Sequence, residues 1–171
     1  MTYIETIGQQ LAETLKRYHA DYIEAHLEES QSGNITYRGR KLESIGRRTA
    51  IGGNVRALVK GGWGFVSFNN LDELPGRVEQ AVKQAQFVGS EESQLARGEP
   101  AIDSALSQVS ENPLTIPLRA KKQLLEEYND IIGGTPGIQT SVINYGDGHK
   151  KTILANSLGS YIEQERADIT L

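Results

Sequence analysis

Residues 51–70 read IGGNVRALVKGGWGFVSFNN and hold five glycines together with the only tryptophan of this 171-residue chain. An apolar residue stands at every second position from 55 to 59, and again at 63 and 65, on either side of the glycine pair 61–62. Alternation of period two around such a pair is typical of a β-hairpin. Glycines at this density also mark backbone that turns sharply or is approached closely by another segment. The stretch therefore predicts two antiparallel strands joined at Gly61-Gly62.

The chain upstream of this hairpin alternates as well. After Asp21, two sets of side chains alternate between the two sides of the expected strand. One side carries Ile23, Ala25 and Leu27, and the other carries Glu24, His26 and Glu28. This predicts a half-buried strand that residues 30–33 end, followed by a second hairpin over residues 34–48 with its turn at 38–41. Residues 21–69 are therefore expected to form about five short strands in an antiparallel meander.

Three stretches have helical periodicity. The first runs from Ile4 to about Arg17, and the second begins at Asn70 or at Pro75 and runs to about Val88. The third begins at Pro117 and ends at Gly133-Gly134. Its expected buried stripe consists of Leu118, Leu124, Leu125, Tyr128, Ile131 and Ile132. The fold class predicted is α+β, an antiparallel β-meander covered by helices.

Strands are expected again after the third helix. Residues 138–145 carry apolar groups on both faces, as a central strand does, and Asp147-Gly148 is a hairpin signal. Two more strands, 151–155 and 160–171, flank a turn at 156–159. The order helix-then-strands thus occurs twice, through an internal repeat or by chance. We expect a first domain over residues 1–98, a linker over 99–117, and a second unit over 118–171 that is cut short.

Composition narrows the class of protein. There is no cysteine, which excludes disulfides and thiolate metal sites within the chain and favours a reducing, cytoplasmic location. No apolar run approaches the roughly 20 residues that span a bilayer, so no membrane partner is expected. The net charge is -4, yet residues 34–60 hold seven basic residues against Glu43 alone, a local net charge of +6. The charge is therefore polarised along the sequence.

Three pieces in order resemble the amino-terminal domain of the TldD/PmbA family, historically called modulators of DNA gyrase. They are DYIEAHLEES at 21–30, NITYRGRKLES at 34–44 and GGNVRALVKGGWGFVS at 52–67. Further on, LANSLG at 154–159 is similar to the Asn-Ser-x-Gly turn of the family. The resemblance covers nearly the whole chain and rests on the order and spacing of these pieces together.

The resemblance implies a subunit of a cytoplasmic zinc metalloprotease, a homo- or heterodimer of related chains that acts on unfolded peptides. In the active subunit a helix with His-Glu-x-x-x-His holds the zinc, and the partner subunit lacks that motif. The three histidines here are followed by Ala20, Leu27 and Lys150, so the chain has no His-Glu pair. We therefore predict no catalytic, cofactor-binding or metal-ligating residue in this chain, and expect zinc only in an active full-length parent.

Other candidate sites have plainer explanations that we favour. His26 with Glu24 and Glu28 could hold a metal, but a solvated strand face explains them, and His19 and His149 are expected at the surface. The basic cluster from Arg38 to Lys60 could bind nucleic acid. Its charges fall on turns and wet strand parities, so we expect surface charge or a contact with an acidic partner instead.

Aromatic residues and paired carboxylates are the last candidates. Trp63, Phe65 and Phe68 could line a peptide channel, although the core face of the sheet is the interpretation we favour. Neighbouring acids in the pairs 28–29 and 126–127 point apart and do not suit acid-base catalysis.

The predicted function is that of an amino-terminal, non-catalytic part of a TldD/PmbA-type metalloprotease subunit, contributing to the peptide channel and subunit assembly. Two alternatives stay open: an inactive assembly subunit, or a binding module for nucleic acid or gyrase without protease activity.

Overall fold

The computed structural model describes residues 4, 6, 8, 11, 14–92, 95, 96, 98–109 and 111–171. Six of the fourteen residues of the first expected helix, Ile4 to about Arg17, lie outside them. Its described residues up to Leu15 are helical, and Ile4, Leu11 and Leu15 are buried. Among the described segments, no helix is long and apolar enough to cross a membrane.

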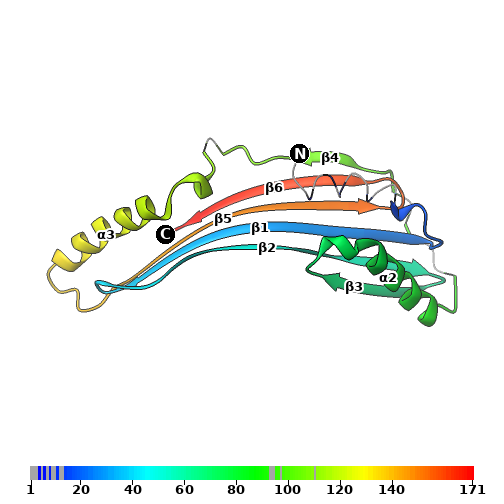
Figure 1. Cartoon of the computed structure of the whole chain (residues 1–171), viewed down its shortest axis with the longest axis horizontal. Helices are drawn as coiled ribbons and strands as arrows, with labels where there is room; N and C mark the ends of the chain where they lie inside the picture. Colours follow the sequence, from blue (N-terminus) through cyan, green and yellow to red (C-terminus); the bar gives the residue numbers. More distant parts are fainter. Residues whose placement is uncertain are drawn as a thin grey trace. The chain divides into compact units, whose positions relative to one another are not determined.

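The described elements form one mixed sheet with two α-helices (Figure 1). In chain order they are β1 (Tyr22–Arg38), β2 (Lys41–Val59), β3 (Gly62–Phe68), the 3-10 turn η1 (Leu71–Glu73), α2 (Leu74–Val88), β4 (Ile102–Ala105), the 3-10 turn η2 (Pro113–Thr115), α3 (Leu118–Gly134), β5 (Val142–Asn156) and β6 (Tyr161–Thr170). The strand order is β3-β2-β1-β5-β6-β4. The predicted α+β class and the meander β1-β2-β3 are confirmed, and β4, parallel to β6, is a strand within the segment expected to be a loop.

The strands are longer and fewer than expected. Residues 21–69 form three strands, because β1 continues through 30–33 and β2 covers both the end of one predicted hairpin and the start of the next. Likewise β5 runs straight through Asp147-Gly148, so the hairpin predicted there is wrong. Both breaks were inferred from turn-forming residues. Here β1 and β5 each have a neighbouring strand on both sides, and those neighbours satisfy the backbone groups that a turn would otherwise free.

Contacts divide the chain into two compact units, each assembled from three stretches. The first contains Met1–Glu29, Ala50–Leu106 and Lys151–Gln164, and the second contains Ser30–Thr49, Ser107–Lys150 and Glu165–Leu171. The boundaries expected at residues 98 and 117, and the internal repeat, stay predictions.

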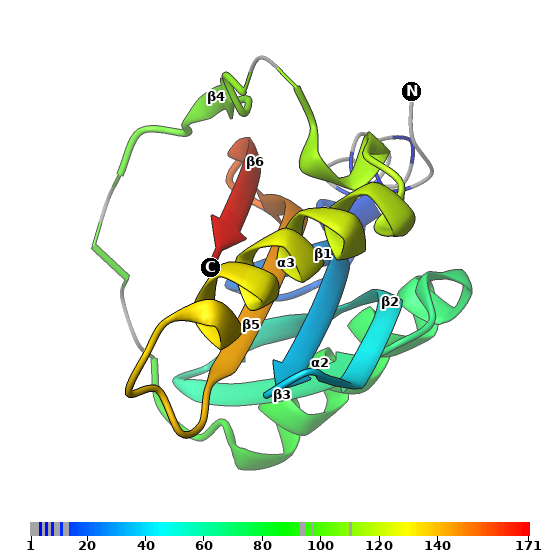
Figure 2. The ribbon, with the colours of Figure 1, turned by 90° about the vertical axis from the view of Figure 1, so that its left-hand side faces the viewer.

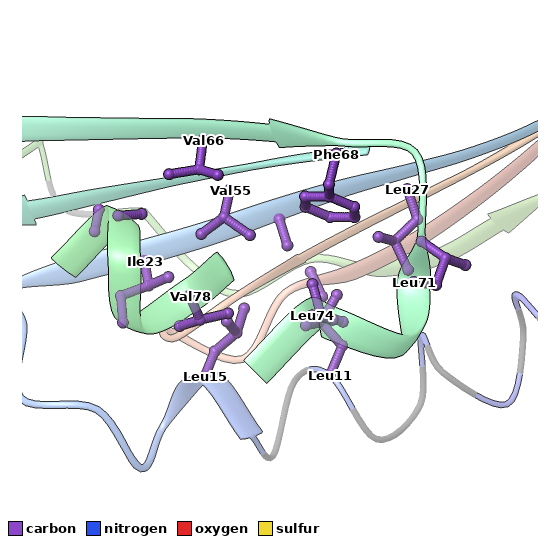
Figure 3. Close-up of a cluster of buried hydrophobic side chains, with 14 of the residues drawn as sticks. Leu11, Leu15, Ile23, Leu27, Val55, Val66, Phe68, Leu71, Leu74 and Val78 are labelled. Atoms are coloured by element: carbon purple, nitrogen blue, oxygen red, sulfur yellow. The ribbon is translucent and has the colours of Figure 1, made fainter. Parts of the chain in front are cut away.

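The first unit has its core between α2 and the face of the sheet that α2 covers (Figure 3). Ile23 and Leu27 of β1, Val55 of β2, and Val66 and Phe68 of β3 point toward Leu74 and Val78 of α2. Asn70 accepts a hydrogen bond from the backbone N–H of Asp72 and so caps η1, and α2 follows from Leu74. The predicted second helix is confirmed.

Two glycines of β3 let α2 lie directly on the strand. A Cβ added at Gly62 or Gly64 would overlap backbone oxygens of α2, that of Ala85 for Gly62 and that of Ala81 for Gly64. The buried parity of β3 is therefore 62, 64, 66 and 68. Trp63 and Phe65 face the other way and are exposed, so the prediction that they form the core face with Phe68 is wrong for both.

The turn between β2 and β3 lies one residue earlier than the sequence suggested. Lys60 and Gly61 both have positive φ, 45° and 77°, as a two-residue type I′ turn requires. The register then pairs Val59 with Gly62 and Leu58 with Trp63. The predicted hairpin is confirmed with this shift.

The second unit packs α3 against its own parts of β1 and β5 (Figure 2). Ile35 and Tyr37 of β1, Leu125 of α3 and Ile143 of β5 make the core. The expected stripe of α3 is only partly correct, because Leu124, Tyr128 and Ile131 are exposed. Leu125 is buried beside two polar residues, Lys121 and Asn129, which have partners: Lys121 pairs with Asp147, and Asn129 donates to the Gly39 carbonyl oxygen at 2.7 Å.

Candidate functional site at Glu24 and Arg56

Glu24 is a buried carboxylate on β1, although its strand parity predicted a wet face. Its side chain is 8% exposed. Arg56 Nε on β2 donates to its Oε1 at 2.5 Å, and the Tyr22 hydroxyl donates to its Oε2 at 2.6 Å. His26 Nε2 lies 3.3 Å from Oε1. The face opposite α2 therefore carries a built polar network, which compensates for the loss of water around the charge.

The network sets the protonation of its members. Burial opposes ionisation of Glu24, but the hydrogen bonds from Arg56 and Tyr22 and the charge of Arg56 outweigh it and lower the Glu24 pKa. Burial and the hydrogen bond to Glu24 raise the pKa of Tyr22 to about 12. The same carboxylate raises the pKa of Arg56. At neutral pH the group is thus a carboxylate, a guanidinium and a neutral phenol.

Trp63 completes this network on the hairpin. The guanidinium carbon of Arg56 lies 5.2 Å from the centre of its ring, within cation-π range. Tyr22 meets the same ring edge-on, with centroids 6.3 Å apart. Because β2 pairs Leu58 with Trp63, Arg56 is the diagonal neighbour of Trp63 on the face opposite α2.

The Asn-Ser-x-Gly turn joins this network from the other end of the chain. Asn156 Oδ1 accepts from the N–H groups of Leu158 and Ser160, at 3.1 and 2.9 Å, and Asn156 Nδ2 donates to the Tyr22 hydroxyl at 3.4 Å. Ser157 exchanges two hydrogen bonds with the backbone of Ile23, one through Oγ and one through its own N–H. Gly159 has φ of 103°. The motif therefore ties the β5–β6 turn to the beginning of β1.

A surface pocket of about 380 Å³ opens beside these groups. Tyr22, Arg56 and Trp63 line it from the strands, and Leu95 and Glu99 line it from the segment after α2. The turn after β5 closes it with Leu158 and Ser160. Charge, aromatic surface and a cavity thus coincide at this place in the first unit.

None of the three histidines considered as candidate ligands has the surroundings of a metal ligand. His26 has one acidic neighbour, and both oxygens of that carboxylate already accept hydrogen bonds. His149 Nε2 lies 2.6 Å from Glu165 Oε1, and His19 is exposed. Among the described residues, no three His, Asp or Glu side chains gather to hold an ion. These residues do not fit a zinc site.

Several members of the basic cluster already have partners. Arg38 pairs with Glu43 at 2.8 Å, Arg47 Nη2 donates to the Ile116 carbonyl oxygen at 2.8 Å, and Arg56 serves Glu24. Their donors are therefore partly satisfied within the chain.

The second unit has a buried polar group of its own. Asp147 of β5 pairs with Lys121 of α3 and accepts from the Tyr145 hydroxyl at 2.9 Å. A Cβ at Gly33 would overlap Asp147 Oδ1. Burial, together with the hydrogen bond to Asp147, raises the pKa of Tyr145 to about 12. This group anchors α3 to the sheet.

Sequence reasoning did not single out Tyr22, Glu24, Arg56 and Asn156 as one group. A signal was present, because 22, 24 and 26 share a parity on β1 and the only tryptophan lies two strands away in the chain order.

Comparison with known proteins decides the family. The sequence profile of the PmbA/TldA metallopeptidase domain 1 matches residues 24–85, the segment that contains Glu24, Arg56, Trp63 and α2. A metalloprotease of Synechocystis sp. is 36% identical over 165 residues, covering 94% of this chain and 36% of that protein. The chain carries the first domain of the TldD/PmbA family at residues 24–85.

Solved structures agree with the fold of this TldD/PmbA chain. A candidate modulator of DNA gyrase from Thermotoga maritima superposes with a TM-score of 0.76 at 14% identity, covering 97% of this chain and 38% of that one. TldE from Thermococcus kodakarensis gives 0.72 at 13% identity, covering 97% and 37%. The TldD/PmbA chain spans about a third of the length of the metalloproteases it matches.

Proposed function

We propose that this chain is the amino-terminal, non-catalytic part of a TldD/PmbA metalloprotease subunit that acts on unfolded peptides. The observation that carries the proposal is the match of the family's first domain to residues 24–85, in a chain without any His-Glu pair. Zinc, its ligands and the general base would come from other parts of the parent, which we place in the cytoplasm.

The proposal assigns this part to subunit assembly with a homologous chain. Supporting it, Leu124, Tyr128 and Ile131 follow one another at steps of four and three along the exposed side of α3, where Ile131 is 68% exposed. Apolar side chains grouped on one side of a helix are typical of surfaces that another protein covers.

The proposal also assigns this part to a wall of the peptide channel. Supporting it, β3 is an edge strand, and Trp63 and Phe65 are exposed on it. Edge strands can bind extended peptides through main-chain hydrogen bonds with little demand on side-chain sequence. Such binding suits unfolded substrates.

The assembly assignment is tested in the full-length parent. Ile131→Glu should shift the parent from dimer to monomer in analytical ultracentrifugation, because a buried unpaired carboxylate is costly. Glu127→Gln, on the same helix outside the apolar stripe, is the matched control. A parent that stays dimeric with Ile131→Glu contradicts the assembly role.

The non-catalytic assignment is tested on the 171-residue chain itself. Purified and supplied with zinc, it should not cleave unfolded peptides above the rate of a buffer control, because it has no His-Glu-x-x-x-His. Chelator-sensitive cleavage that co-purifies with the chain would overturn the assignment. Reading the parent gene for that motif then separates an active subunit from an inactive assembly subunit.

A further inference from the structure

The pocket beside Arg56 is not accounted for by the proposed function. Its volume, about 380 Å³, lies within the range of small-molecule pockets, roughly 300–1,000 Å³. It lies wholly within the first unit and is built from the strands, the segment after α2 and the turn after β5. Three separate stretches thus converge on one cavity.

Two contacts hold the guanidinium of Arg56 in place. Its Nε is used by the buried Glu24, and its guanidinium lies against the ring of Trp63. Its two terminal nitrogens donate no hydrogen bond to any residue that the structure describes. A guanidinium fixed at Nε keeps a pair of parallel donors, and this pair matches the two oxygens of a carboxylate.

Part of the lining is apolar and partly exposed to water. Trp63, Leu95 and Leu158 line the pocket and are 44%, 41% and 51% exposed. A ligand whose carboxylate reached Arg56 would cover these side chains with its remaining part. An apolar ligand body would gain free energy from that burial.

Glu99 adds a negative charge to the lining of the pocket. It lines the same cavity and is exposed, and it takes part in no ion pair among the described residues. Its negative charge disfavours a second anionic group in the ligand and favours an ammonium. The lining therefore combines a guanidinium, apolar side chains and a carboxylate.

We propose that this pocket binds a small zwitterion with an apolar side chain, either a free amino acid or a short peptide with a free carboxylate end. Arg56 takes the carboxylate, Trp63 and Leu158 cover the side chain, and Glu99 faces the ammonium. The assignment rests on the pocket alone and does not require the chain to be part of a peptidase.

Trp63 provides the measurement, because it is the only tryptophan and it lines the pocket. The dipeptide Ala-Leu, titrated into the 171-residue chain, should change the tryptophan fluorescence saturably. Ala-Leu amide should bind at least about tenfold more weakly than Ala-Leu, because it lacks the charged partner of Arg56. Free leucine is the second probe: equal affinity assigns the pocket to single amino acids, and weaker affinity assigns it to peptide ends. No saturable change with either probe, or equal affinity for acid and amide, overturns the proposal.

Glu99→Gln tests the effect of this negative charge, and it leaves the buried groups unchanged. It should tighten N-acetyl-Ala-Leu about two- to fivefold, by removing a repulsion, and should not tighten Ala-Leu. Glu92→Gln, an exposed residue of the same segment outside the pocket, is the matched control and should change neither. If both variants change the two affinities alike, the assignment of Glu99 to the ligand ammonium is wrong.

Leu158→Asp tests the carboxylate end, with Leu158→Asn as its neutral isostere. Both remove the apolar wall, but only the aspartate repels a carboxylate. Ala-Leu should therefore bind the aspartate variant about two- to fivefold more weakly than the asparagine variant, while Ala-Leu amide should not distinguish them in that direction. Equal weakening of acid binding by both variants would place the carboxylate elsewhere.

Discussion

At the scale of single residues, Glu24 is buried among other polar side chains on the side of β1 that the strand pattern predicts to be exposed to solvent. Glu24 has given up most of its water for Arg56, Tyr22 and His26. The parity rule still predicted its side of the strand correctly. Parity does not predict that the guanidinium, the phenol and the turn at Asn156 cover that side, because these groups come from other parts of the chain.

Glu24 should make stability depend on pH in the acidic range. Its pKa is lower in the folded chain than the ordinary 4.5, so the ionised carboxylate stabilises the fold above that value. This contribution is lost as the pH falls below 4.5 toward the folded pKa. Glu24→Gln should therefore lower stability at pH 7 by about 2 kcal/mol and flatten the loss of stability on acidification.

Urea denaturation between pH 3 and 7 measures this effect. Glu79→Gln is the control, since Glu79 forms an exposed pair with Lys83 on α2 and such pairs contribute little. A Glu24→Gln curve parallel to the wild-type curve across this range would contradict the role of Glu24.

At the scale of elements, the glycines of β3 decide which side of the hairpin is buried. A strand with Trp63 and Phe65 on one face and glycines on the other would ordinarily bury its aromatics. Here α2 lies so close that only Gly62 and Gly64 fit beneath its backbone, and the aromatics are left outside. The periodicity of α2 was readable from Val78, Ala81, Val82 and Ala85, but its approach distance was not.

Gly64→Ala should disrupt this packing. The new methyl group would overlap the Ala81 carbonyl oxygen, which is backbone and cannot rotate away, so α2 must shift. We expect a loss of about 1–3 kcal/mol in thermal or urea denaturation, as for other overpacked sites.

Gly76→Ala is the matched control within α2. A Cβ there meets nothing within 4 Å, and alanine favours a helix over glycine by about 1 kcal/mol. The two variants should therefore move stability in opposite directions. Destabilisation of similar size in both would show that close helix approach is not the reason for Gly64.

At the scale of the whole molecule, the described chain has two hydrophobic clusters, one in each compact unit. β1, β2, β5 and β6 each contribute residues to both units, so a strand boundary is not a unit boundary. The buried pair Lys121–Asp147 belongs to the second unit alone.

Leu125→Ala should show whether each cluster stabilises its own unit. Leu125 is fully buried in the second unit, and such a truncation costs about 2–5 kcal/mol. Hydrogen exchange should then quicken most for amides of α3 and for residues 142–150 of β5. Amides of α2 and β3 should keep more of their protection. Uniform loss of protection in both units would mean that they unfold together.

The amino-acid sequence by itself determined the features that depend on neighbouring residues: strand parity, the glycine turn near 61, the extents of α2 and α3, and the ordered motifs that place the chain in its family. Tertiary structure decided the continuity of β1 and β5, the exposed position of Trp63 and Phe65, and the network of Tyr22, Glu24, Arg56 and Asn156. The reason is physical. Period and turn chemistry act within a few residues, whereas the burial of a charge, or of one face of a strand, depends on what packs against it. In this chain the packing partners are α2, lying on Gly62 and Gly64, and a turn more than 130 residues from Tyr22.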